Sequence, residues 1–220
     1  MKFINGKEHA MKKSLLFVAW ISLVGAAVPF GWGAIINGSF ELGPPIVGDA
    51  VFVGGGSTDI NGWIVTGHSV EVLGPPWDAF DGNRCLDLSG YDAGGVQQTF
   101  STIPGMTYAV TFNLAGNPEG PPQYKQVRVS VDSFQHDYEV NSAGQTRYNL
   151  DWIPISFQFV ASGSSATLWF KSQQNDAYGP LLDNVAVLPV PEPDGELLLA
   201  TSLCLLAAVY SVRPSHLFGQ

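Results

Sequence analysis

The sequence is poor in positive charge and in cysteine. Its 220 residues contain 10 Lys and Arg against 19 Asp and Glu, which gives a formal net charge of −9. A nucleic-acid-binding protein needs a basic face to neutralise phosphates, so this balance argues against nucleic acid as a partner. Two cysteines are too few for a scaffold held together by several disulfides.

Charged residues are scarce as a whole, at 13%, whereas 45% of the residues are hydrophobic and 12% are aromatic. This composition argues against a disordered chain, which would have few aromatics and many charges. The 25 glycines and 15 prolines are many for a helical protein and usual for a β-rich one with many turns. The composition therefore indicates a folded, β-rich protein.

The N-terminal segment 1–34 has the pattern of a secretory signal peptide. Lys12 and Lys13 precede an apolar run that continues to Val28, and small residues follow it. Met11 is a plausible true start, and cleavage fits after Ala27 or close to residues 33–34. The alternative interpretation of this run is a buried hydrophobic helix.

A second apolar run lies near the C-terminus, at residues 197–212, and Arg213 follows it directly. Its sixteen uncharged residues are close to the roughly 17–25 that cross a bilayer, so the run predicts a transmembrane helix. Ahead of it, residues 190–193 contain two prolines two positions apart, a spacing that favours a stiff extended segment.

The C-terminal segment 189–220 resembles the PEP-CTERM sorting signal of bacterial surface proteins. The resemblance rests on a short motif, an apolar helix and a basic residue, in that order: Val190, Pro191, Glu192, Pro193 and Arg213. It implies a temporary membrane anchor that is recognised, and then cut, by an exosortase-type sorting enzyme. The family usually ends in a cluster of arginines, whereas Arg213 stands alone here. An ordinary C-terminal membrane anchor is the alternative.

Between the two ends, residues 35–188 form the predicted domain. It has five positive and fifteen acidic residues, a net charge of −10. The acidic residues fall mostly in loops or at outward strand positions, which indicates a solvated surface.

Apolar and polar residues alternate through this domain, as in residues 108–114, 127–132 and 167–171. Strands that are buried on one face produce this period of two, because successive side chains point to opposite sides. Clusters of Gly, Pro, Ser and Asn separate the alternating segments. About ten short strands with frequent turns predict an all-β sandwich of two antiparallel sheets.

A series of short motifs also resembles the choice-of-anchor C family of bacterial exported proteins. The motifs are Asn37–Glu41, Gly62–Trp63, Leu86–Gly90, Gln98–Phe100, Pro104–Tyr108, Phe112–Pro118 and Gly179–Val185. This resemblance implies a jelly-roll β-sandwich like galactose-binding domains and carbohydrate-binding modules. It implies no particular ligand.

Galactose-binding-like sandwiches often hold a structural calcium ion where the first and last strands meet. Glu41 follows the first motif and Asp183 lies in the last one, so these two carboxylates are the candidate calcium ligands. The alternative is that both carboxylates cap turns without a metal.

Several aromatic residues lie in loop-like segments rich in Gly, Pro and Asp. Flat aromatic faces stack on the apolar faces of sugar rings, while nearby polar groups bond the hydroxyls. The candidate carbohydrate-binding residues are Trp77, Tyr124, Trp152 and Tyr178, with Tyr91 as a further loop aromatic. Trp63 and Trp169 lie on strand-like segments and are interpreted as structural.

No segment of the predicted domain marks a catalytic site. Cys85 is interpreted as a small buried hydrophobic residue, and His68 and His136 lack the spacing of a zinc site or a nucleophile triad. The leading hypothesis is a non-catalytic protein of the bacterial envelope or extracellular matrix that is exported, binds glycan and carries no cofactor except a possible calcium ion. The alternatives are a structural protein-interaction domain and a secreted polysaccharide hydrolase.

Overall fold

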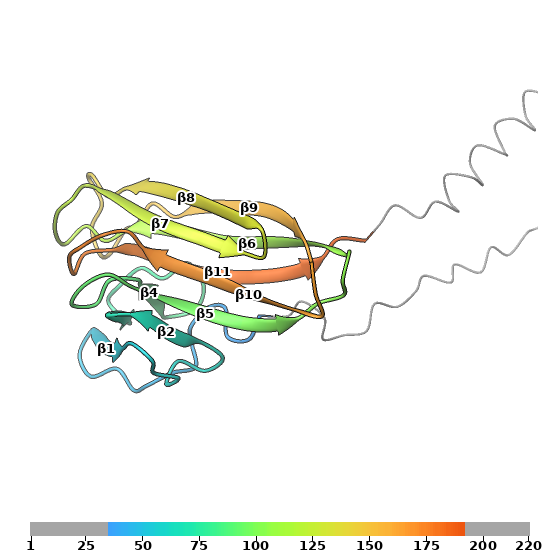
Figure 1. The fold of residues 1–220 in the computed structure, drawn as a ribbon. Helices are drawn as coiled ribbons and strands as arrows, with labels where there is room; N and C mark the ends of the chain where they lie inside the picture. Colours follow the sequence, from blue (N-terminus) through green and yellow to red (C-terminus); the bar gives the residue numbers. More distant parts are fainter. Residues whose placement is uncertain (1–34, 192–220) are drawn as a thin grey trace, which may run out of the picture.

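In a computed structural model, residues 35–191 are described and form a β-sandwich (Figure 1). The first sheet has the strand order β1-β3-β4-β11-β6-β9, and the second has the order β2-β5-β10-β7-β8. Every strand pair within the two sheets is antiparallel. The predicted sandwich of two antiparallel sheets is therefore confirmed.

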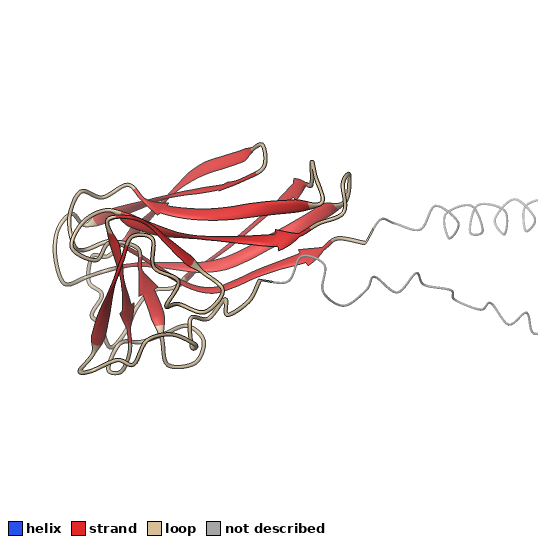
Figure 2. Ribbon diagram, turned by 60° about the horizontal axis from the view of Figure 1, so that its bottom comes forward, coloured by secondary structure: helices blue, strands red, loops and turns tan. Residues whose placement is uncertain are grey.

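The six strands of the first sheet are β1 (Ala50–Gly54), β3 (Ser69–Leu73), β4 (Cys85–Asp87), β11 (Pro180–Pro189), β6 (Thr107–Gly116) and β9 (Ile153–Val160). The five strands of the second sheet are β2 (Ile64–Gly67), β5 (Gly94–Ser101), β10 (Ser165–Ser172), β7 (Tyr124–Val131) and β8 (Phe134–Asn141). Figure 2 shows the strands in two layers with loops at their ends.

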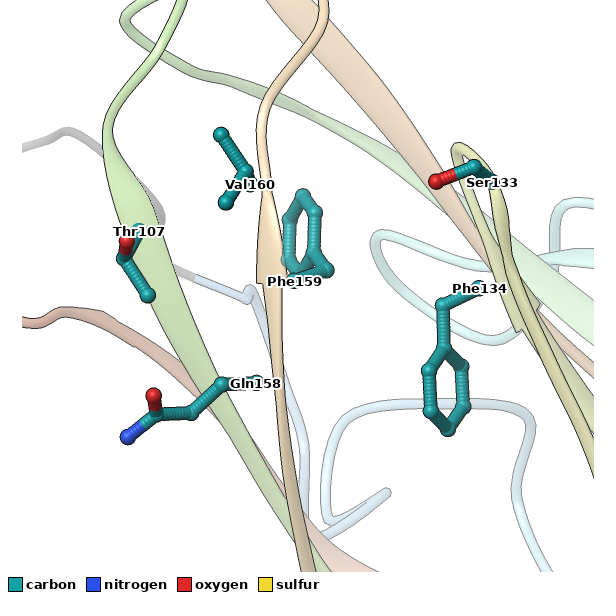
Figure 3. Close-up of a pocket in the computed structure, with 6 residues that line it drawn as sticks. All are labelled: Thr107, Ser133, Phe134, Gln158, Phe159 and Val160. Carbon is teal, nitrogen blue, oxygen red and sulfur yellow. The ribbon is translucent and has the colours of Figure 1, made fainter.

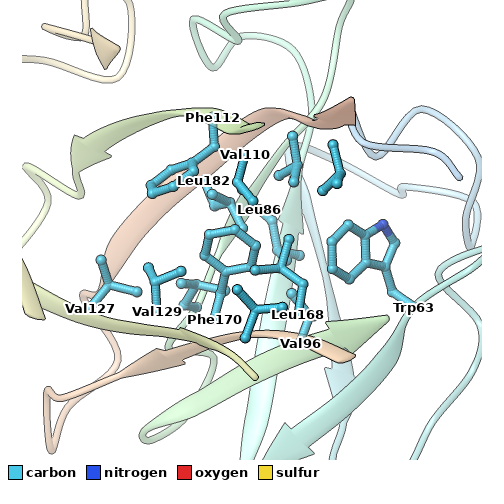
Figure 4. Packing of buried hydrophobic residues seen from close by; sticks show 14 of the residues in the cluster. Trp63, Leu86, Val96, Val110, Phe112, Val127, Val129, Leu168, Phe170 and Leu182 are labelled. Atoms are coloured by element: carbon cyan, nitrogen blue, oxygen red, sulfur yellow. The ribbon is translucent and has the colours of Figure 1, made fainter. Parts of the chain in front are cut away.

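The alternation of apolar residues determines which face of each strand is buried. In β6, Tyr108, Val110 and Phe112 point into the sandwich and are almost fully buried, while the exposed Thr111 lies between two of them. Strand β7 repeats the pattern with alternate valines. The two inner faces meet in one hydrophobic core, in which the rings of Phe112 and Phe170 pack edge to face with centroids 5.0 Å apart (Figure 4).

The first and last motifs of the described chain pack against each other. The backbone N–H of Val185 donates to the carbonyl of Gly38, and a Cβ on Gly38 would overlap the Val185 carbonyl oxygen. The register of β11 shifts between Asp183 and Ala186, and Asn184 within this irregularity has a positive φ of 53°. A glycine at position 38 is therefore required for the N-terminal segment to lie on β11.

The predicted signal peptide (1–34) and the predicted membrane helix (197–212) lie outside the described residues. Within residues 35–191, no helix is long and apolar enough to cross a membrane.

Candidate functional site

A pocket of about 320 Å³ opens on the outer face of the first sheet. Strands β1 and β3 provide its floor through Ala50, Phe52, Glu71 and Leu73. Asp49, just before β1, and the loops that follow β3, β4, β6, β8 and β10 provide the remaining lining residues, and several of these loops gather at the left of Figure 1. Segments far apart in the chain thus converge on one pocket.

Arg147, in the loop after β8, joins two sides of the pocket. It makes a bidentate ion pair with Glu119, with both N···O distances at 2.8 Å, and its Nη1 lies 2.6 Å from Asp49. Its guanidinium carbon is 5.0 Å from the ring centroid of Trp77, within the range of a cation–π contact. The hydrogen bonds from Arg147 lower the pKa of Glu119. Both carboxylates beside Arg147 are therefore paired within the protein.

Asp87, the last residue of β4, forms hydrogen bonds with two of the loops that border the pocket, the loop after β6 and the loop after β10. Its carboxylate accepts a 2.7 Å hydrogen bond from the Asn117 side chain and a 3.1 Å hydrogen bond from the Gly179 N–H. A third bond comes from Ser89 N–H. Asp87 is completely buried, and this burial raises its pKa to about 7 despite the three donors.

Tyr178 is held between a glycine and a lysine. Gly120 packs against the ring so closely that any Cβ at this position would overlap it. The Lys125 side chain is buried along its length, donates from Nζ to the Gly120 carbonyl at 2.8 Å, and lies 5.9 Å from the Tyr178 ring centroid. Tyr178 itself is 37% exposed and lines the pocket.

Glu71 lies on the floor of the pocket between Phe52 of β1 and Asp87 of β4 in the strand register. Within residues 35–191 its carboxylate has neither an ion-pair partner nor a hydrogen bond. Partial burial, the largest cause, and the charge of Asp49 raise the pKa of Glu71 to about 7, while Arg147 acts in the opposite direction. Glu71 is thus a half-buried carboxyl group that faces a cavity without a partner in the described fold.

An exposed aromatic pair adjoins this floor. The rings of Phe52 and Tyr91 stack with centroids 4.0 Å apart and an angle of 9° between their planes. Phe52 lines the pocket, and Tyr91 is 66% exposed. The pair extends the aromatic surface beyond the pocket toward solvent.

Two of the four predicted carbohydrate-binding residues, Trp77 and Tyr178, line this pocket, and Tyr124 and Trp152 do not. Trp77 is only 8% exposed and forms part of the wall beneath Arg147. Trp152 donates its indole N–H to the Asp78 carbonyl at 2.9 Å and packs edge to face with Phe80. Tyr124 is exposed at the start of β7.

The two predicted calcium ligands both hold the loop before β4. Asp183 accepts hydrogen bonds from the N–H groups of Phe80 and Asp81, and Glu41 accepts them from Asn83 and Arg84. Carboxylates that accept backbone N–H groups in this way cap a turn, which is the alternative to calcium ligation by these two residues. Within residues 35–191 no group of three or more His, Cys, Asp or Glu side chains is arranged to hold a metal ion. Calcium binding stays a prediction.

A second hollow, of about 440 Å³, lies between β9 and the turn that joins β7 to β8 (Figure 3). Its six lining residues include Phe134 and Phe159, and none of the six is charged. In Figure 3 the amide of Gln158 points away from Phe134, so the polar and aromatic groups do not converge there. The pocket over β1 and β3 combines aromatic walls with several polar groups, and it is therefore the better candidate for ligand binding.

Two acidic residues are exceptions to the solvated acidic surface. Asp87 and Asp183 are fully buried, whereas the other acidic residues of the domain are exposed or partly exposed. Trp169 is 39% exposed on the outer face of β10, whereas Trp63 is buried in the core as expected. Cys85 is a free, completely buried thiol, as predicted.

Sequence reasoning missed Phe52, Glu71, Asn117, Glu119 and Arg147 as pocket residues. Glu71 and Phe52 occupy ordinary outward positions of alternating strands, so their pattern carries no functional signal. Asn117 and Glu119 do lie in the Gly- and Pro-rich segment 116–124, whose length alone indicates a loop able to border a pocket.

The fold and the site define an all-β sandwich with a loop-bordered pocket on one sheet. The chain belongs to the family described as "Protein of unknown function (DUF642)", whose model matches residues 33–188.

Two curated proteins are similar in sequence. One is an Arabidopsis thaliana protein described as "Protein DUF642 L-GALACTONO-1,4-LACTONE-RESPONSIVE GENE 1", 30% identical over 192 residues, which cover 82% of this chain and 49% of that protein. The other is halomucin of Haloquadratum walsbyi, 28% identical over 189 residues, which cover 80% of this chain and 2% of halomucin. The chain thus spans half or less of the length of these relatives.

Among solved structures, the fold is similar to that of carbohydrate-binding modules. TmCBM61 in complex with β-1,4-galactotriose has a TM-score of 0.49 and 16% identity, covering 71% of this chain and 99% of that chain. A family 16 carbohydrate-binding module has a TM-score of 0.46 and 19% identity, covering 70% of this chain and 98% of that chain. These likenesses concern the fold alone.

Proposed function

We propose that this protein is a non-catalytic carbohydrate-binding protein, and that the pocket over β1 and β3 is its glycan site. The carrying observation is the convergence of Phe52, Tyr178 and Glu71 on one pocket of about 320 Å³. Aromatic rings contact the apolar faces of sugars, and the carboxylate bonds hydroxyl groups. Ion pairs and buried hydrogen bonds hold the surrounding loops before any ligand binds, which reduces the entropy lost on binding.

The carboxylates of the pocket favour binding over hydrolysis. Glycoside hydrolases commonly need two carboxyl groups that reach the scissile bond. Of the three acidic residues that line the pocket, Asp49 and Glu119 are both paired with Arg147. Asp87 is completely buried and bonded to backbone and side-chain donors. Glu71 therefore stands alone as an unpaired carboxyl group in the described pocket.

The site belongs, in this proposal, to an exported protein of the cell envelope or extracellular matrix. The proposal is supported by the signal-like segment 1–34 and by the motif-helix-arginine order of residues 190–213. An exosortase-type enzyme would act on the C-terminal segment after membrane insertion. The sandwich would then carry the glycan site to the outer surface.

The test is a binding measurement with the purified protein against a panel of soluble neutral polysaccharides, followed by titration calorimetry with an oligosaccharide of any that binds. We expect Tyr178→Ala to weaken binding by about tenfold, equivalent to about 1.4 kcal/mol, because a stacking face is lost. Trp169→Ala is the matched control, since Trp169 is similarly exposed but lies on the other sheet.

An equal effect of Tyr178→Ala and Trp169→Ala would place binding elsewhere on the molecule and overturn the assignment of the pocket. Failure of every glycan to bind would overturn the carbohydrate-binding function and favour a structural protein-interaction domain.

A further inference from the structure

We propose that the pocket selects glycans that carry a free amino group, such as polymers of glucosamine, and that Glu71 is the residue that recognises the amine. This inference deepens the proposed function and rests on it. It follows from the charges, the unpaired groups and the neighbours of Glu71 in the pocket.

The charges that line the pocket are mainly negative. Asp49, Glu71 and Glu119 contribute three carboxylates, and Arg147 is the sole Lys or Arg among the lining residues. Three N–H groups of Arg147 already bond Glu119 and Asp49, so this cation is engaged within the protein. A uronic acid would therefore meet uncompensated negative charge, and an ammonium group would meet a favourable field.

Glu71 is the group best placed to receive a cation. Its neighbours in the register are Phe52 and Asp87, and the charged groups around it are Asp49, Asp87 and Arg147. Burial without a counter-ion raises the pKa of Glu71, so the isolated carboxylate is poorly stabilised. A protonated amine would supply the missing partner through a charge-assisted hydrogen bond, which is about twice as strong as a neutral one.

The aromatic neighbours suit the rest of such a ligand. Phe52 lies directly beside Glu71 across the β1–β3 pair, and Tyr178 also lines the pocket. A sugar ring packed on an aromatic face would have its substituents at the ring edge, within reach of an adjacent carboxylate. An ammonium group close to an aromatic ring gains further cation–π attraction.

Three oligosaccharides with the same β-1,4 linkage and the same length test this inference: oligomers of glucosamine, of N-acetylglucosamine and of glucose. They differ only in an amine, an acetamide or a hydroxyl at one ring position. Titration calorimetry at neutral pH should show the glucosamine oligomer binding at least about tenfold more tightly than the glucose oligomer. Glu71→Gln should abolish this preference, so that the glucosamine and glucose oligomers bind the variant with equal affinity.

Glu139→Gln is the matched control, because Glu139 is an exposed carboxylate of β8 that bonds Gln126 and lies outside the pocket. Both substitutions replace a carboxyl group with an amide of nearly the same size. An equal loss of glucosamine binding in both variants would show general attraction of a polycation to an acidic protein, and would overturn the inference.

Equal binding of all three oligomers to the unaltered protein would also overturn the amine selectivity, but would leave the carbohydrate-binding function standing. If none of the three binds and the polysaccharide panel is also negative, the proposed function itself fails. The two failures are therefore distinguishable.

Discussion

At the scale of single residues, the pocket depends on polar groups whose charge is controlled by the fold. Arg147 is paired with two carboxylates, and Asp87 is buried beneath the loops that it holds. The raised pKa values of Glu71, Asp87 and Asp183 share burial as their largest cause. Each group costs free energy when it ionises in the folded protein, so the fold should respond to pH.

The first prediction concerns Asp87. An unfolded Asp releases its proton near pH 4, whereas in the folded protein the pKa of Asp87 is about 7. Between these values the folded state binds more protons, so the free energy of unfolding should fall as the pH rises from about 4 to about 7, and should level off above that. In Asp87→Asn the free energy of unfolding should fall less over this pH range, by on the order of 2 kcal/mol.

Urea denaturation at several pH values measures this slope, and the slope rather than the absolute stability is the readout. Asp137→Asn serves as the control, because the exposed Asp137 pairs with Arg128, which lowers its pKa. A group with a lowered pKa does not add to a fall between pH 4 and 7. If the slope in Asp87→Asn equals that of the unaltered protein, the buried Asp87 is not the cause of the pH dependence, and the prediction is wrong.

At the scale of elements, the sheets are rigid supports and the loops form the site. Strands β6 and β11 pair over most of their length in the middle of the first sheet, and β1 and β3 pair at its edge. The loop after β6 approaches the loop after β10 so closely that Gly120 touches the Tyr178 ring. The contact between these two loops therefore determines where Tyr178 lies.

The second prediction follows from this contact. Gly120→Ala should displace the Tyr178 ring, because the added methyl would overlap it. Glycan affinity should fall by about tenfold with little change in the melting temperature, since both loops lie at the surface. Gly163→Ala is the matched control: its Cβ would lie 3.6 Å from its nearest neighbour, an ordinary contact, in the turn before β10. Unchanged affinity in Gly120→Ala would show that the position of Tyr178 does not matter.

At the scale of the whole molecule, one acidic sandwich lies between two apolar segments with different predicted roles. Residues 35–188 carry a net charge of −10, and the family model covers nearly the same residues. Export and anchoring rest on the terminal sequence patterns, which lie outside the described residues. The proposed glycan site at the cell surface draws on all three parts of the chain: segment 1–34 for export, the domain 35–188 for binding and segment 189–220 for anchoring.

The third prediction tests this arrangement. Mass spectrometry of the protein recovered from its native envelope fraction should show that the N-terminal residues are missing up to a position between 27 and 34, because a signal peptidase removes such a segment. The C-terminal run 197–212 should be absent from the fraction released to the medium and present in the membrane fraction. An intact N-terminus in the mature protein would contradict the predicted export.

The fold could be predicted from the sequence because its signals are local. The alternation in residues 108–114 and 127–131 shows which side chains face the core, and Gly- and Pro-rich segments mark the turns between strands. The interpretation of Cys85 and Trp63 as buried residues depends on the same pattern. These features require only that a strand presents alternate side chains to opposite faces.

The site could be predicted only in part. Trp77 and Tyr178 were recognisable as loop aromatics, but nothing in their surroundings separated them from Tyr124 and Trp152. Glu71 and Arg147 are 76 positions apart in the chain, and their shared pocket depends on strand pairing and loop packing.

The sequence by itself thus determined the β class, the strand faces, the acidity of the domain and the contrast between the domain and its two apolar ends. Only the tertiary structure decided that Asp87 is buried, that Arg147 is paired and that Glu71 faces a cavity alone. The reason is physical: periodicity is a property of neighbouring residues, whereas the burial and partners of a carboxylate depend on distant segments that meet when the two sheets close.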